Sequence, residues 1–301
     1  MARIQKPLIA FKAQLVQAPM QGLLRNTDGE LARRLKRAMR EHDRYAERTV
    51  SLFLILTRFA KTSYESACFI ASDDDDGSRR RKEFVLVLPP INRQLIDMLF
   101  NIVYITDDFP SRSLEYELYG YRQAREQYDQ LYARFGEDPK WQEYFEDQRE
   151  LQKTMERYLS ISNQQREDPK QTIRYWPGPA KLLKRTSKSK KFMEFLNIWF
   201  YGQMSAQVHL NPAGLFSVSM YLLLDFAPAG ARENVEGRKF QQFKFTHFSR
   251  NIMLVLAILS ETENFCRLGN SEDLRKVWGI LAGYSEEAAD VYHERYQDML
   301  K

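Results

Sequence analysis

The sequence holds only two cysteines and four histidines in 301 residues. Cys68 and Cys266 stand alone in apolar segments, which excludes a disulfide framework and predicts free thiols in a reducing compartment. So few ligands, spread so far apart, also argue against a zinc site. Four consecutive aspartates at residues 73–76 lack the alternate spacing of a calcium loop. We therefore expect no metal and no cofactor.

Several common catalytic motifs are missing as well. The sequence has no phosphate-cradling glycine loop, no HExxH, no Cys-x-x-Cys and no Gly-x-Ser-x-Gly turn. Long apolar runs are also missing, because the longest, at residues 214–224 and 252–259, fall short of the ~20 residues that a membrane span needs. The first residues lack the apolar core of a signal peptide. We expect a cytoplasmic protein with no membrane partner.

The composition that is present is that of a soluble globular protein. Hydrophobic residues make up 44% and charged residues 28% of the chain. Sixteen Tyr, 19 Phe and four Trp argue against disorder. The net charge of +5 is modest for this length and leaves the class of partner open.

Apolar residues recur mostly at helical spacing, which predicts an all-α fold. Only residues 83–88 could form a strand, and no internal repeat is visible. We expect residues 1–301 to form a single multi-helix bundle of about nine or ten helices. Its irregular parts would be an N-terminal arm at 1–26, a charged and mobile loop at 73–82, and a basic, loop-rich segment at 161–192.

Capping signals set the expected helix boundaries. Thr27 and Glu30 form a capping-box pattern that predicts one long helix to about residue 72. Pro89 and Pro90 open a helix that is apolar nearly all round and therefore central. Serine caps open the last two helices. The remaining helices are expected at residues 112–135, 139–160, 192–210, 213–226, 240–268, 271–283 and 285–301.

Two interior helices carry polar residues that could meet at one point. Arg93 and Asp97 lie one turn apart on the central helix, and Ser205 and His209 lie one turn apart on a later one. A histidine in an apolar helix needs partners for both ring nitrogens. The four residues could form a catalytic site, or a structural network around a satisfied core histidine.

These residues resemble a known pattern. The Arg93-x3-Asp97 turn, followed by a Tyr-x3-Ser-x3-His-x-Asn-Pro run that starts at Tyr201, resembles a helical bacterial family of unknown function. The likeness continues through Tyr121-Arg122 and Trp176-Pro177-Gly178 and covers about residues 85–225. The usual acid of that family is Glu, whereas this chain has the shorter Asp97.

That family is similar to the HEPN group of toxin–antitoxin, abortive-infection and CRISPR-linked systems, which implies a HEPN-like core. Many members of the group are metal-independent ribonucleases with an Arg-x(4–6)-His motif. His209 has no such arginine before it, and the match of Arg37 with His42 is what chance alone would give. Arg37 lies in a charged segment typical of a solvated helix face. If the protein cleaves RNA, His209 with Arg93 in trans is the preferred pair, and dimerisation could also bring two such sites together.

A basic segment offers a second functional hypothesis. It could grip a phosphate backbone and stack a base, or it could be a solvated linker. Its candidate nucleic-acid-binding residues are Trp176, Lys181, Lys184, Arg185, Lys188, Lys190 and Lys191.

Two functions from different classes follow. The first is RNA binding or metal-independent RNA cleavage in a bacterial stress or phage-defence system. The alternative is a non-catalytic helical scaffold or dimerisation module, with a homodimer or another protein as partner. A hydrolase with Ser205 as nucleophile is less favoured, because a serine in mid-helix is poorly exposed for attack.

Overall fold

The computed structural model describes residues 14–71, 86–185, 187–208 and 240–301, and these residues form helices and no strand. The all-α prediction is therefore confirmed. The single domain expected from the sequence is instead divided into two compact units. The first unit comprises Met1–Val103 and Ser189–Lys301, and the second comprises Tyr104–Lys188. The charged loop at 73–82 lies outside the described residues.

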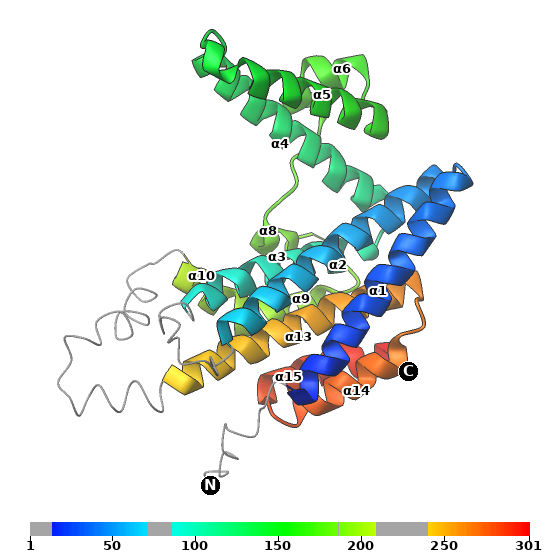
Figure 1. The fold of residues 1–301 in the computed structure, drawn as a ribbon, viewed down its shortest axis with the longest axis vertical. Helices are drawn as coiled ribbons and strands as arrows, with labels where there is room; N and C mark the ends of the chain where they lie inside the picture. The colour runs from blue at the N-terminus through cyan, green and yellow to red at the C-terminus, as the bar shows by residue number, and fades with distance from the viewer. Residues whose placement is uncertain (1–13, 72–85, 186, 209–239) are drawn as a thin grey trace, which may run out of the picture. The chain divides into compact units, whose positions relative to one another are not determined.

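Two long helices, α1 (Gln14–Arg40) and α2 (Arg44–Ala71), form an antiparallel hairpin in the first unit (Figure 1). The prediction of one helix from Thr27 to residue 72 is wrong, because the chain turns at residues 41–43. His42 has a φ of 54°, and the Asp43 N–H donates to the Ala38 carbonyl, which caps α1. The Asp43 carboxylate accepts from the Ala46 N–H and opens α2. Thr27 is buried inside α1, so it starts no helix.

The helices α3 (Leu88–Thr106) and α13 (Phe240–Cys266) supply much of the buried apolar surface of the first unit. The prediction that α3 is central is confirmed, since Leu95, Ile96, Leu99 and Phe100 are fully buried. Every residue of α13 from Ile252 to Leu259 is at most 1% exposed. Burial all round marks both helices as interior elements.

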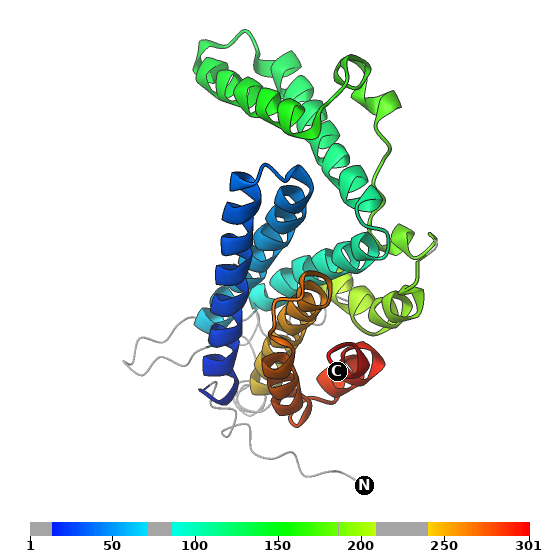
Figure 2. The ribbon, with the colours of Figure 1, turned by 90° about the vertical axis from the view of Figure 1, so that its right-hand side faces the viewer.

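The C-terminal helices pack against α13, as two views show (Figures 1 and 2). They are α14 (Ser271–Ala282) and α15 (Glu286–Val291), followed by a π-helical turn at Tyr292–Tyr296 and α16 (Gln297–Met299). The Ser285 hydroxyl accepts from the Ala288 N–H, which confirms that cap. The expected cap at Ser271 is off by one residue, because Asn270 precedes the helix and Ser271 donates to Glu263 instead.

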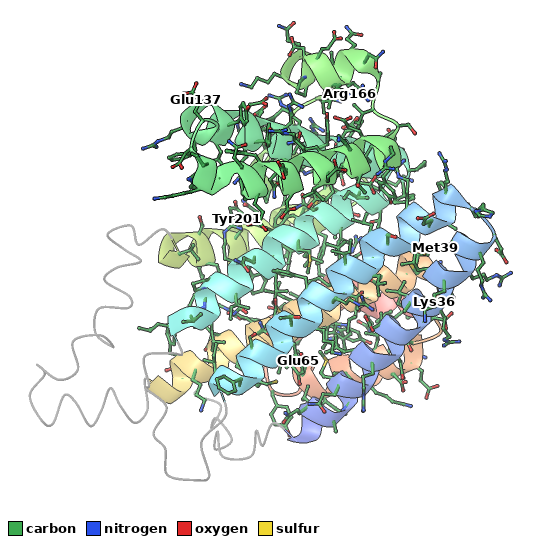
Figure 3. All side chains as sticks on the ribbon, turned by 45° about the horizontal axis from the view of Figure 1, so that its top comes forward. Lys36, Met39, Glu65, Glu137, Arg166 and Tyr201 are labelled. Atoms are coloured by element: carbon green, nitrogen blue, oxygen red, sulfur yellow. The ribbon has the colours of Figure 1, made fainter. Side chains whose placement is uncertain are left out.

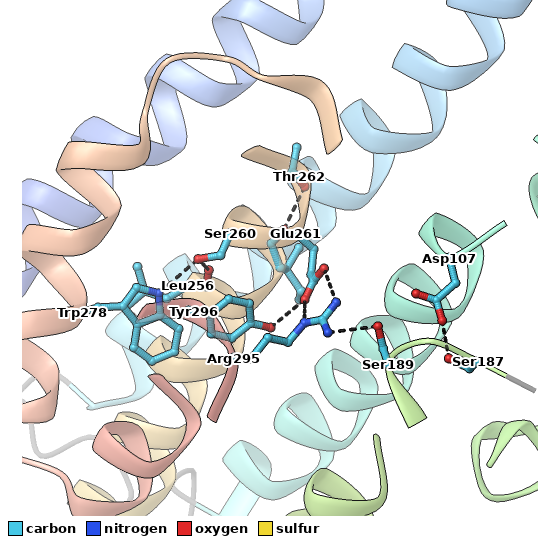
Figure 4. Close-up of polar contacts among 11 residues, drawn as sticks. Asp107, Ser187, Ser189, Leu256, Ser260, Glu261, Thr262, Trp278, Arg295 and Tyr296 are labelled. Carbon is cyan, nitrogen blue, oxygen red and sulfur yellow. Dashed lines mark hydrogen bonds and ion pairs between the residues drawn. The ribbon is translucent and has the colours of Figure 1, made fainter. Parts of the chain in front are cut away.

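A buried ion pair joins this C-terminal segment to α13 (Figure 4). Arg295 donates to both oxygens of Glu261, at 2.5 and 3.0 Å, and the Tyr296 hydroxyl donates to Glu261 at 3.1 Å. Arg295 also donates to Ser189, the residue that precedes α9 (Lys190–Leu196). Glu261 is 1% exposed, so its charge depends on these partners rather than on water.

The second unit is built on a hairpin of α4 (Ser111–Phe135) and α5 (Gln142–Leu159), which confirms the two predicted helices. A 3-10 turn at Pro139–Trp141 joins them. The expected irregular segment 161–192 instead contains α6 (Asn163–Glu167), α7 (Pro169–Thr172) and α8 (Pro179–Leu182), and it enters α9 (Lys190–Leu196). The expected N-terminal arm likewise becomes helical from Gln14 onward.

None of the described helices combines the length and the apolar character that crossing a bilayer would require.

Candidate functional site

The side chain of Arg93 is the centre of the candidate site in the first unit. It forms an ion pair with Asp97, one turn further along α3. Its Nη2 donates to the hydroxyl of Tyr201, and its guanidinium carbon lies 3.9 Å from the centroid of the Tyr201 ring. Figure 3 labels Tyr201 on its helix. An ion pair, a hydrogen bond and a cation–π contact together fix the position of the guanidinium.

A π-helical turn places Tyr201 beside Arg93. The helix runs from α9 through this turn (Asn197–Tyr201) into α10 (Gly202–Val208), and the Gly202 N–H donates to the Asn197 carbonyl. A π turn rotates the following residues relative to a regular helix and is frequent at functional sites. Tyr201 also meets Phe100 of α3 edge-on, with ring centroids 5.7 Å apart.

The surroundings of Tyr201 keep its hydroxyl protonated. Burial raises the pKa of Tyr201, and the charge of Arg93 offsets only part of that increase. The hydroxyl accepts from Arg93, so its own proton is free to be donated to a different acceptor. The Arg93 side chain is 12% exposed and the Asp97 side chain 36%, so the edge of the pair reaches solvent.

The structure therefore brings together two of the four predicted catalytic residues and adds Tyr201. Ser205 lies in α10, four residues beyond Tyr201 on the same helix face, and is partly exposed. His209 lies outside the described residues, so its place beside Arg93 remains a prediction. The sequence spacing already indicated that Tyr201 shares a helix face with Ser205 and His209. Tyr201 precedes Ser205 by four residues, and Ser205 precedes His209 by four residues.

A second buried arginine, which sequence reasoning missed, holds α10 to the rest of the unit. Arg250 of α13 donates to both oxygens of Glu287, at 2.8 and 2.6 Å, and to the side chain of Gln203 at 3.1 Å. Its side chain is 8% exposed. The signal was an arginine inside a nearly continuous apolar helix, which must find acceptors.

A buried histidine, also missed, lies where α13 packs against α3. Asn92, the neighbour of Arg93, donates to the carbonyl of His247 at 2.7 Å and accepts from Asn251 at 3.0 Å. His247 is 3% exposed. Burial, with a smaller contribution from the charge of Arg250, lowers the pKa of His247 to about 3. This imidazole is therefore neutral at physiological pH.

The predicted nucleic-acid-binding residues fall in both units. In the second unit Lys181, Lys184 and Lys188 are exposed, and Arg185 forms an ion pair with Glu115 at 3.6 Å. In the first unit Lys190 and Lys191 are exposed, and Lys190 pairs with Glu194 at 3.7 Å.

Trp176 does not fit the stacking role expected for it. It is 5% exposed, and its ring packs edge-on against Tyr104 and Tyr116. A ring enclosed in this way is a core residue of the second unit and offers no face to a base. Its neighbour Tyr175 is 52% exposed.

Arg37 and His42 have the spacing of the Arg-x(4–6)-His motif, and the sequence predicts that Arg37 lies on a solvated helix face. The Arg37 side chain is 72% exposed and pairs with Glu41 at 2.9 Å. No cluster of three or more potential metal-ligating side chains occurs within the described ranges.

No protein-family model, curated protein or solved structure matches this sequence.

Proposed function

We propose that this protein binds RNA and cleaves it without a metal ion, with Arg93, Asp97, Tyr201, Ser205 and His209 as its centre. The observation that carries the proposal is the guanidinium of Arg93, held by Asp97 and by the ring and hydroxyl of Tyr201. A fixed guanidinium of this kind recognises phosphate oxygens. The setting in a bacterial stress or phage-defence system rests on the family resemblance alone.

The proposed reaction is general acid–base transesterification. His209 takes the proton of a ribose 2′-hydroxyl, and the 2′ oxygen attacks the adjacent phosphorus. The bond from phosphorus to the 5′ oxygen of the next nucleotide breaks, and Tyr201 donates its proton to that oxygen. Arg93 stabilises the charge that develops on the non-bridging oxygens. The products are a 2′,3′-cyclic phosphate and a free 5′-hydroxyl.

The other residues have supporting roles in this proposal. Asp97 holds the guanidinium of Arg93 in place, and Ser205 donates a hydrogen bond to the substrate phosphate. The exposed lysines between residues 181 and 191 bind the RNA backbone through its charge.

A non-catalytic scaffold is the second candidate function, and one observation favours it. Only 12% of the Arg93 side chain is exposed, as expected for a polar contact that fastens two helices together. In that case Arg93, Asp97 and Tyr201 would set the register between α3 and the π-helical turn at Asn197–Tyr201 and would touch no substrate.

Replacing His209 by alanine distinguishes the two functions. We expect the rate of cleavage of a single-stranded RNA, measured at saturating protein with a metal chelator present, to fall at least roughly 100-fold because the general base is lost. The melting temperature should stay within a few degrees of the wild-type value. The control is His293→Ala, which removes an exposed histidine bonded to Gln297 and should leave cleavage unchanged.

The scaffold would be the better account if the wild-type protein left RNA intact and His209→Ala lowered the melting temperature. Cleavage by His209→Ala at the wild-type rate would contradict the proposed role of His209 as the general base.

A further inference from the structure

The end of the α1–α2 hairpin, at residues 33–48, carries surplus positive charge. Residues 33–48 hold seven Lys or Arg and three Asp or Glu, a surplus of four charges in a chain whose net charge is +5. All of these residues belong to the first unit. Such a concentration attracts polyanions.

Three of these arginines share one face of α1. Arg33, Arg37 and Arg40 follow one another at spacings of four and three residues, so they form a row along the helix. The row spans about 10 Å, at 1.5 Å per residue. The side chains of Arg33 and Arg37 are 78% and 72% exposed, and Arg40 is also exposed.

The carboxylates beside the arginine row do not cancel its charge. Arg33 pairs with Glu30 at 2.5 Å, and Arg37 pairs with Glu41 at 2.9 Å. The Arg37–Glu41 pair is exposed on both sides and is therefore weak, and Glu30 is shared between Arg33 and Arg34, so that one carboxylate offsets two guanidinium groups. Arg34 is excluded from the row because it donates to the carbonyls of Cys266 and Arg267 and serves the fold.

A hollow lies beside the row, and its walls combine charged side chains, including Glu30 and Glu41, with small apolar ones. Its volume is about 550 Å³, and its lining includes Arg33, Arg37, Ala46 and Val50. Met39 and Tyr45, at the same end of the hairpin, are 54% and 57% exposed. Figure 3 labels Lys36 and Met39 there. Exposed cations interleaved with an aromatic ring are typical of surfaces that bind single-stranded nucleic acid.

We infer that this face of the α1–α2 hairpin binds the phosphate backbone of single-stranded RNA through Arg33, Arg37 and Arg40. The inference rests on the proposed function, to which it adds the surface that holds the substrate. An anionic membrane is a less suitable partner, because Met39 and Tyr45 are the only large apolar side chains exposed within residues 33–48, and they offer little apolar surface to insert between lipids.

The test is the salt dependence of RNA binding, measured by fluorescence anisotropy between 50 and 200 mM KCl. The probe is a labelled 2′-O-methyl oligonucleotide, which lacks the nucleophilic hydroxyl and therefore reports binding without cleavage. For the triple variant R33Q/R37Q/R40Q we expect the slope of log affinity against log salt to become shallower by about 2, since each phosphate contact on a single strand contributes about 0.7. Over this range the wild-type protein would then lose roughly twentyfold more affinity than the variant.

The matched control is R149Q/K153Q/R157Q, which removes the same charge from one exposed face of α5 and should keep the wild-type slope. Circular dichroism of both variants establishes that they are folded. An unchanged slope in R33Q/R37Q/R40Q overturns the inference, and so does arginine-dependent binding to phosphatidylglycerol vesicles without binding to the oligonucleotide.

The two proposals fail in different ways. Arginine-dependent RNA binding by a protein that does not cleave RNA would support this surface and contradict the proposed function. Cleavage that depends on His209, with an unchanged salt slope in R33Q/R37Q/R40Q, would do the reverse. No RNA binding by the wild-type protein at 50 mM KCl would overturn both.

Discussion

Replacing Glu261 by glutamine is expected to lower the stability of the first unit by about 3 kcal/mol, because it leaves the guanidinium of Arg295 without its buried counter-charge. Glu261 is 1% exposed, and the Arg295 side chain is 18% exposed. Burial and the carboxylate of Glu261 raise the pKa of Tyr296, so its hydroxyl stays a donor to that carboxylate. An amide at this position would accept from fewer of these donors and would carry no charge.

Native-state hydrogen exchange of the α13 amides measures this loss within the first unit, separately from the second. The control is Glu272→Gln, which removes an exposed partner of Lys276 and should leave the exchange rates unchanged. The triple variant E261L/R295M/Y296F, which also removes the Tyr296 hydroxyl that donates to Glu261, should regain most of the lost stability, since a buried ion pair can be replaced by apolar side chains at little cost. Equal effects of Glu261→Gln and Glu272→Gln would contradict the importance assigned to this ion pair.

Acidification from pH 7 to pH 4 is expected to destabilise the first unit by about 3 kcal/mol through His247 alone. The pKa of His247 is lowered to about 3 in the folded protein, against an ordinary value of 6.5. Below pH 6.5 the unfolded chain therefore binds a proton that the folded chain does not. Stability falls progressively from about pH 6.5 toward pH 3, where the folded imidazole also becomes protonated.

Hydrogen exchange of α13 at pH 7, 5.5 and 4, corrected for intrinsic exchange rates, isolates this contribution when the wild-type protein is compared with His247→Gln. Carboxylates that titrate over the same range affect both proteins equally, so the difference between them belongs to His247. We expect the variant to lose about 3 kcal/mol less than the wild type between pH 7 and pH 4. Parallel losses in the two proteins would show that His247 is not buried in its neutral form.

The interior helices were predictable because their apolar residues cover every side. In α3 and α13, burial all round leaves few alternatives to an interior helix. The hairpin of α4 and α5 was also predictable, because two amphipathic segments flank Gly136 and Pro139. These features depend on local sequence.

Other features depend on tertiary contacts and were not predictable. The turn at residues 41–43 has no glycine or proline, and His42 adopts the left-handed conformation there. The first boundary between the two units, at Val103, lies inside the apolar helix α3, so no composition shift marks it. Trp176 lies among prolines and near lysines, yet Tyr104 and Tyr116 enclose its ring.

For the candidate site, sequence spacing identified pairs within a helix, but not which side chain of the later helix contacts Arg93. Arg93 and Asp97 were predictable, because four residues place them on one helix face. The π turn that places Tyr201 beside Arg93 has no sequence signature, and nothing local ties Arg250 to Glu287 across 37 residues. Such long-range pairs follow from packing rather than from spacing.

The most direct test of the central claim, that Arg93 acts on RNA, is the single-turnover rate of RNA cleavage by Arg93→Lys in the presence of a metal chelator. Lysine keeps the positive charge beside Asp97 and removes the planar, two-pronged contact with phosphate. We predict a rate at least roughly 100-fold below that of the wild-type protein, with hydrogen exchange of α3 unchanged. Equal rates for the two proteins, or faster exchange of α3 without a loss of cleavage, would contradict the account and leave Arg93 a structural residue.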